Sequence, residues 1–168
     1  MTEIPNFKFA LRKDLVITTG ATKSSFLPAR GTPKSTGWDV RAALREPLIL
    51  RAGQYAKIPL GFRVLSPDGW WLELRPRSST FGKKSLHALY GVIDEDYEGE
   101  CLFACQYIPD ISSMGSDLII NYGDAIGQII PAERREMKVV ELTNDELDIE
   151  YKKRNAQRGA GGFGSTGK

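Results

Sequence analysis

Five short segments of the sequence carry the side chains that could do chemistry. They are TGWDVRAA (36–43), RPRSST (75–80), GVIDEDYEGE (91–100), GDAIGQIIP (123–131) and RGAGGFGSTG (158–167), and each is too polar and too rich in turn residues for the core of a strand. Carboxylates in such segments can activate a water molecule, and arginine and hydroxyl groups can bind a phosphate. Each segment also has an ordinary structural explanation. RPRSS fits a solvated turn, GVIDEDYEG a loop whose Asp side chains cap a turn, and GDAIGQ a hairpin.

The end of the chain, RGAGGFGSTGK (158–168), is rich in glycine and has no apolar pattern. Fixing glycine in one conformation costs more backbone entropy than fixing any other residue, and no burial compensates here. Two explanations remain open. The segment is a disordered tail or an expression scar, or it is an arm that becomes ordered when a ligand rich in oxygen atoms gives its backbone N–H groups partners.

The length, composition and net charge indicate what kind of protein carries these segments. A chain of 168 residues, 41% hydrophobic and 26% charged, is typical of one globular domain. Its net charge of +2 is too small to indicate a nucleic-acid or membrane surface, so we expect neither partner. The sequence has no apolar run of about 18 residues and no signal peptide. We therefore expect a cytoplasmic protein.

The cysteines and the single histidine exclude several kinds of site. Cys101 and Cys105 alternate with apolar residues in ECLFACQYI, as they would on one face of a strand, and we expect buried thiols. A zinc site needs about four ligands, which His87 cannot complete. One histidine also makes a Ser-His or Cys-His triad a poor explanation.

Short apolar segments separated by Gly, Pro, Asp and Ser predict an all-β fold, a sandwich or jelly roll. We expect strands within 7–20, 37–43, 55–65 (broken at Pro59-Leu60-Gly61), 69–77, 89–94, 101–108, 118–123 and 125–131, with a last strand at 138–142. Residues 24–36 and 109–117 are expected to be loops. At most one short helix is predicted, within RSSTFGKKSL (77–86). TNDELDIEYKKRN (143–155) has an Asn or Thr cap but weak apolar spacing, which is typical of a connector.

Together, in this order and spacing, the five segments resemble the five sequence motifs of the trimeric dUTP diphosphatases, the dUTPases, from about Gly31 to Gly167. The resemblance implies a distorted jelly-roll β-barrel or sandwich and Mg²⁺-dependent hydrolysis of dUTP to dUMP and pyrophosphate, which keeps uracil out of DNA. It also implies a homotrimer with shared active sites. In that reading, residues 1–155 form the β domain, and residues 156–168 form a flexible arm that closes over the active site.

The resemblance also implies roles for individual residues. Asp94 would orient and deprotonate the attacking water, and Asp39 would hold Mg²⁺ through its water ligands. The ring of Tyr97 would lie under the deoxyribose and leave no room for a 2′-hydroxyl. The remaining positions would bind substrate: the phosphates by Arg77, Ser78, Ser79 and Gln128, the uracil by the backbone of Ala88, Gly91, Val92 and Ile93, and the closed nucleotide by Arg158, Gly162, Phe163, Gly164, Ser165 and Thr166.

Two positions depart from the family pattern. Ala88 stands where many members have Asn, so uracil recognition would use main-chain groups alone. Ala125 follows the Asp of GD, where members usually have Arg; Arg75 and Arg63 are candidates to replace that arginine.

Two alternatives are weighed against a dUTPase. A dCTP deaminase shares the fold, but its catalytic glutamate would fall at Ala104. A regulatory protein that binds dUTP without turnover is the second alternative.

Overall fold

The computed structural model describes residues 4–15, 26–113 and 115–154. The chain divides into two compact units, Met1–Arg135 and Glu136–Lys168. The boundary expected between residues 155 and 156 falls outside the described residues and stays a prediction.

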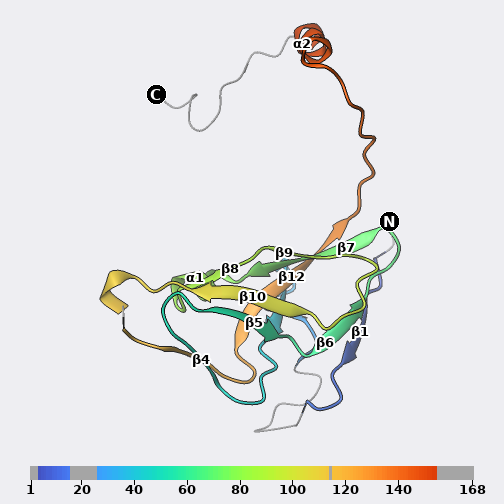
Figure 1. Ribbon diagram of the computed structural model, residues 1–168. Helices are drawn as coiled ribbons and strands as arrows, with labels where there is room; N and C mark the ends of the chain where they lie inside the picture. The colour runs from blue at the N-terminus through green and yellow to red at the C-terminus, as the bar shows by residue number, and fades with distance from the viewer. Residues whose placement is uncertain (1–3, 16–25, 114, 155–168) are drawn as a thin grey trace. The chain divides into compact units, whose positions relative to one another are not determined.

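The first unit is built from short strands, which confirms a mostly β protein (Figure 1). In chain order they are β1 (Lys8–Leu11), β2 (Ala29–Arg30), β3 (Trp38–Arg41), β4 (Leu48–Leu50), β5 (Tyr55–Pro59), β6 (Phe62–Leu65), β7 (Trp70–Pro76), β8 (Leu86–Ala88), β9 (Gly91–Ile93), β10 (Leu102–Tyr107), β11 (Leu118–Ile120) and β12 (Ala125–Glu133).

The strands pair antiparallel in several sheets. The largest has the order β2-β3-β12-β7-β9, and a second has the order β5-β10-β8. Two-stranded sheets are formed by β1 with β6 and by β11 with β4. Strand β12 therefore lies at the centre of the five-stranded sheet, with β3 on one side and β7 on the other.

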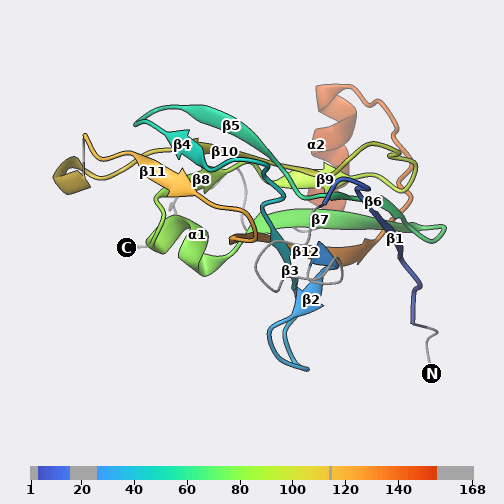
Figure 2. The same cartoon turned by 90° about the horizontal axis from the view of Figure 1, so that it is seen from below.

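The core lies between the five-stranded and the three-stranded sheets, which face each other in Figure 2. Phe103 of β10 packs so closely on β12 that a Cβ on Gly127 would lie 2.9 Å from its ring. The alternation expected in GWWLELRPR is present, because Leu72 and Leu74 of β7 are buried in this core. The arrangement is a sandwich whose inner faces carry the apolar residues of both sheets.

Of the two cysteines, Cys105 lies on the face of β10 that points into the core, and Cys101 directly precedes this strand. Cys101, Phe103 and Cys105 alternate with more exposed residues, as the sequence predicted, and the thiols are buried and free. Burial raises the pKa of Cys101 to about 12 and that of Cys105 to about 11, because a thiolate loses its hydration there.

The second unit contains α2 (Asn144–Lys153), which makes the expectation of at most one short helix wrong. Thr143 and Glu146 form a capping box: the Thr143 hydroxyl accepts from the Glu146 N–H, and the Glu146 carboxylate accepts from the Thr143 N–H. The hydrogen bonds that the Glu146 carboxylate accepts from the N–H and the hydroxyl of Thr143 lower the pKa of Glu146. The cap outweighs the weak apolar spacing from which a connector was expected.

Some of the other predicted helices and strands are confirmed by the structure, and others are wrong. The predicted short helix is α1 (Ser78–Gly82), and the break between β5 and β6 falls at the expected place. The strand predicted at 138–142 is wrong, since these residues have no regular structure. Strands β2, β4 and β8 were not predicted, and the 109–117 loop contains a 3-10 turn, Ile111–Ser113. Among the described residues, no helix is both long and apolar enough to cross a membrane.

Candidate functional site

Three of the predicted phosphate and metal residues lie together where β3, β12 and β7 run side by side. Asp39 of β3 is the cross-strand partner of Gln128 in β12, and Gln128 is in turn the partner of Arg75 in β7. Arg77, just beyond the end of β7, donates from Nε to Oδ1 of Asp39 at 2.9 Å. Both side chains are partly exposed, so this charged pair borders solvent.

The side chain of Gln128 is held at the end of β7. Its Nε2 donates to the carbonyl of Pro76 at 3.0 Å. Gly37 makes room for it, because a Cβ at residue 37 would lie 2.1 Å from the Gln128 Oε1. A side chain at residue 37 would therefore displace the Gln128 amide from this position.

Ser78 and Ser79 form the first turn of α1, and the buried Thr80 fixes that turn to the sheet. The Thr80 hydroxyl donates to the carbonyl of Ile126 at 2.6 Å and accepts from the Arg77 N–H at 3.2 Å. Because Thr80 is fully buried, both bonds are shielded from water. Ser78 itself remains exposed beside Arg77.

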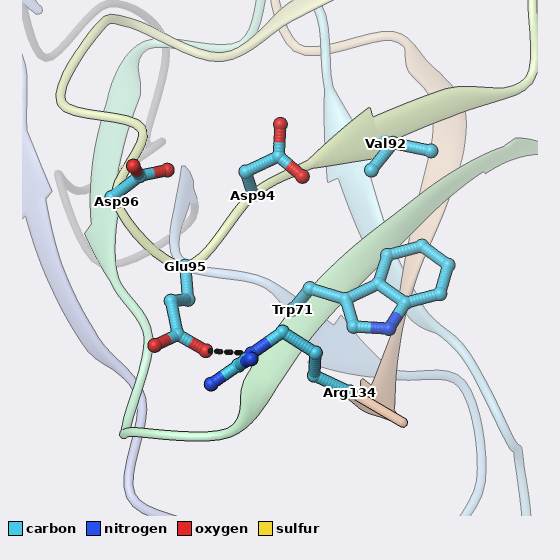
Figure 3. Close-up of a pocket in the computed structure, with 6 residues that line it drawn as sticks. All are labelled: Trp71, Val92, Asp94, Glu95, Asp96 and Arg134. Atoms are coloured by element: carbon cyan, nitrogen blue, oxygen red, sulfur yellow. Dashed lines mark hydrogen bonds and ion pairs between the residues drawn. The ribbon is translucent and has the colours of Figure 1, made fainter. Parts of the chain in front are cut away.

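Asp94 lies in a different place, immediately after the end of β9. The Tyr97 N–H donates to the Asp94 carbonyl at 3.1 Å and closes a tight turn. Asp94 is exposed at a cavity of about 410 Å³ (Figure 3). The cavity is lined by Trp71, Val92, Asp94, Glu95, Asp96 and Arg134.

Tyr97 is held by the residues that follow it. Its hydroxyl donates to the carbonyl of Glu100 at 3.1 Å, and its ring lies over Gly99, where a Cβ would be 2.3 Å from the tyrosine oxygen. The Glu100 carboxylate accepts from Arg12 at 2.8 Å and from the Gly61 N–H at 3.1 Å. These contacts tie the segment after Tyr97 to the body of the unit.

The residues predicted to contact uracil come from two sheets. Ala88 ends β8 and is paired with Cys105, whereas Gly91, Val92 and Ile93 form β9, paired with β7. Within the described part of the chain, β9 pairs on one side alone and is an edge of its sheet. An edge strand presents unpaired N–H and C=O groups, which is the chemistry that main-chain recognition of a base requires.

One chain does not bring Asp94 near Arg77. Ile93 is the partner of Leu72, which puts Asp94 level with Trp71 at the start of β7. Arg77 lies six residues farther along, beyond the end of the same strand. At about 3.3 Å per residue, this separation is roughly 20 Å.

The turn before Ala125 is held by residues that sequence reasoning missed. Arg41 donates to the Gly123 carbonyl at 2.9 Å, and Lys84 pairs with Asp124 at 3.1 Å. The two expected replacements do not take this role: Arg75 pairs with Glu73, and Arg63 donates to the Glu98 carbonyl. Ala125 in place of the usual arginine indicated that other residues hold this turn. It did not indicate that these residues are Arg41 and Lys84.

The remaining predicted positions were Arg158, Gly162, Phe163, Gly164, Ser165 and Thr166. All of them lie outside the described residues. In the part of the chain that is described, no group of three or more His, Cys, Asp or Glu side chains is arranged to hold a metal ion.

Comparison with known proteins gives consistent matches along the chain. A family model described as dUTPase matches residues 23–167. The deoxyuridine 5′-triphosphate nucleotidohydrolase of Treponema denticola is 36% identical over 151 residues, which are 89% of this chain and 96% of that protein.

Solved structures match as well. The dUTPase of Staphylococcus bacteriophage 80alpha with the dUTP analogue dUPNHPP has a TM-score of 0.73 at 21% identity, covering 97% of this chain and 99% of that one. A mutant dUTPase of phage phi11 of S. aureus, which coordinates a structural Mg(II) ion, has a TM-score of 0.65 at 20% identity, covering 83% of this chain and 99% of that one.

Proposed function

Because the chain belongs to the dUTPase family and hydrolyses dUTP to dUMP and pyrophosphate, we propose that Asp94 activates the attacking water. The observation that carries this proposal is the position of Asp94, exposed at a cavity of about 410 Å³ directly after an edge strand. A carboxylate there can reach a water molecule, and the adjacent strand edge can bind the base of the nucleotide.

In the proposed reaction, a water bound to the Asp94 carboxylate gives it a proton as its oxygen forms a bond to the α-phosphorus of dUTP. The bond from that phosphorus to the bridging oxygen breaks, and pyrophosphate leaves. Asp94 then passes the proton to solvent. Since a carboxylate is a weak base, positioning and charge neutralisation must supply most of the acceleration.

Arg77, Ser78, Ser79 and Gln128 are the proposed phosphate ligands. The guanidinium of Arg77 and the exposed hydroxyl of Ser78 are adjacent, which gives a charged fork beside a hydroxyl donor. Gln128 is aligned with them through its pairing with Asp39.

Asp39 is the proposed residue for Mg²⁺, acting through bound water. The donor set fits this indirect role, because one oxygen of Asp39 is already paired with Arg77 and no cluster of three ligands exists among the described residues. Mg²⁺ keeps several waters and takes substrate phosphates as ligands. When bound, it supplies positive charge to the triphosphate.

Tyr97 and the β9 edge are the proposed selectivity elements. The N–H and C=O groups of Gly91, Val92 and Ile93, together with Ala88, would read uracil. The Tyr97 ring would lie under the deoxyribose and exclude a 2′-hydroxyl. The ring lies against Gly99 and its hydroxyl donates to the Glu100 carbonyl, which supports a role that depends on a defined ring position.

We propose further that the active site is shared in a homotrimer. A separation of roughly 20 Å along β7 between Asp94 and Arg77 is too long for both to act on one α-phosphorus. The Asp94 of one copy acting with the Arg77 of another removes this difficulty. The arm, residues 156–168 with Phe163 stacked on uracil and Arg158 at the γ-phosphate, would come from a third copy.

The family match decides between the alternatives for the reaction. A dCTP deaminase would need a glutamate at position 104, where Ala104 lies in β10 opposite Lys57. The relative from T. denticola is itself a nucleotidohydrolase, which favours turnover over a purely regulatory role.

The test of this proposal is Asp94→Asn, which keeps the shape of the side chain and removes the proton acceptor. We expect kcat for dUTP to fall by roughly 10²–10⁴, with binding of a non-hydrolysable dUTP analogue largely retained. Asp96→Asn is the matched control, since Asp96 is a neighbouring exposed carboxylate at the same cavity. Pyrophosphate release at the wild-type rate by Asp94→Asn would show that another group activates the water.

A further inference from the structure

The carboxylate next to Asp94 is anchored, unlike those on either side of it. Oε2 of Glu95 accepts from the Gly69 N–H at 3.0 Å and from Nε of Arg134 at 3.0 Å, as Figure 3 shows for the arginine. Asp94 and Asp96 are exposed, whereas Glu95 is half-buried. One oxygen atom thus joins three separate segments of the chain.

The two groups that hold Glu95 are themselves fixed to each other. The Arg134 N–H donates to the Gly69 carbonyl at 2.7 Å, directly beyond the pairing of Glu133 with Trp70. Gly69 has a φ of +76°, a conformation that suits glycine and sets the direction of its N–H. The end of β12 and the turn before β7 therefore form one rigid support beneath the Asp94 turn.

We propose that Glu95 is a positioning residue, which with Arg134 and the Gly69 amide holds the Asp94 turn in the geometry that the water attack requires. This inference rests on the proposed role of Asp94. The turn from Asp94 to Tyr97 is short, so a shift of Glu95 moves Asp94 directly. Small misplacements of a reacting group cost large factors in rate, whereas a partly exposed ion pair contributes little to stability.

The first experiment compares Glu95→Ala, Arg134→Ala and Glu95→Gln by steady-state kinetics with dUTP. We expect kcat to fall about tenfold in Glu95→Ala and Arg134→Ala, with KM unchanged within about twofold. Glu95→Gln should recover most of kcat, because one amide oxygen can accept both hydrogen bonds that Oε2 accepts now. Glu98→Ala is the control, an equal loss of charge in the same exposed loop.

The second experiment repeats Glu95→Ala in the Asp94→Asn background, where it should cause no further loss of kcat. An additional loss would mean that Glu95 acts independently of Asp94. A wild-type kcat in Glu95→Ala, or a raised KM at unchanged kcat in Arg134→Ala, would also overturn the inference. Full activity of Asp94→Asn alone would overturn the proposed role of Asp94. Loss of activity in Asp94→Asn together with a wild-type kcat in Glu95→Ala would overturn the role of Glu95 alone, so the two failures are distinguishable.

Discussion

At the scale of single residues, Gly37 and Gly99 leave room for the side chains of Gln128 and Tyr97. A Cβ at Gly99 would collide with Tyr97, and a Cβ at Gly37 would collide with Gln128. Neither glycine has the positive φ that would explain it by backbone conformation. In each case a neighbouring side chain lies so close to the glycine Cα that a Cβ would displace it.

Gly99→Ala should therefore impair sugar selection. The new methyl group must displace the Tyr97 ring, so we expect the ratio of kcat/KM for dUTP to that for UTP to fall by roughly tenfold or more. The measurement is pyrophosphate release from each nucleotide. Gly31→Ala is the control, since the nearest atom to its Cβ is at 3.8 Å. An unchanged ratio would mean that Tyr97 does not select the sugar.

At the scale of elements, helix α1 depends on one buried hydroxyl. Thr80 joins the start of the helix to β12 through the Ile126 carbonyl and to Arg77 through its N–H. Since α1 carries Ser78 and Ser79, the same contact that stabilises the helix also places the proposed phosphate ligands against the sheet.

Thr80→Val should be destabilising, because it leaves the Ile126 carbonyl buried without its partner. Such a loss costs about 1–3 kcal/mol, or a fall in Tm of roughly 2–4 °C per kcal/mol for a chain of this size. Thr80→Ser keeps the hydroxyl and should lie nearer the wild type. Thermal unfolding followed by circular dichroism at one fixed protein concentration makes the comparison. Equal Tm values for the Val and Ser variants would contradict this role of the hydroxyl.

The elements also show what the sequence could and could not predict. The alternation in β7 and in β10 was readable because one face of each strand is buried in the core. Strand β2 has two exposed residues and carries no such pattern. Residues 138–142 include three apolar side chains but have no partner strand within the described residues, while α2 forms through its cap.

The motifs themselves show which residue types could bind a phosphate or activate water. The Asp39–Arg77 pair was expected as two separate ligands, and their contact follows from strand register. Contacts such as Arg41 with Gly123, or Glu95 with Arg134, join segments far apart in the chain. Local patterns in one sequence do not reveal which distant residues meet, so these partners were missed.

At the scale of the whole molecule, the proposed ligands form two groups that one chain holds apart. Asp39, Arg77 and Gln128 lie at one end of β7, and Asp94 is level with its other end. Association of copies is the arrangement that would unite them. In a closed symmetric trimer the three sites are equivalent, and each copy would contribute a different segment to each site.

Mixing two inactive proteins tests this arrangement. One carries Asp94→Asn, and the other ends after Ala156 and so lacks the arm. After joint unfolding and refolding at equal amounts, about a quarter of the sites in random trimers should combine an intact Asp94 with an intact arm from another chain. Activity should therefore return in part. Mixtures that stay inactive, although trimers form, would show that the arm and Asp94 act from the same chain.

The burial of Cys101 and Cys105 has a practical consequence for following the protein in solution. With pKa values of about 12 and 11, both thiols stay protonated and enclosed at neutral pH, and protonated buried thiols react poorly with maleimides. A cysteine introduced at an exposed position outside the proposed ligands, such as Lys83→Cys at the end of α1, would be the preferred target for a fluorophore or spin label. The native cysteines can then remain, and the sandwich core keeps its packing while the label reports on nucleotide binding.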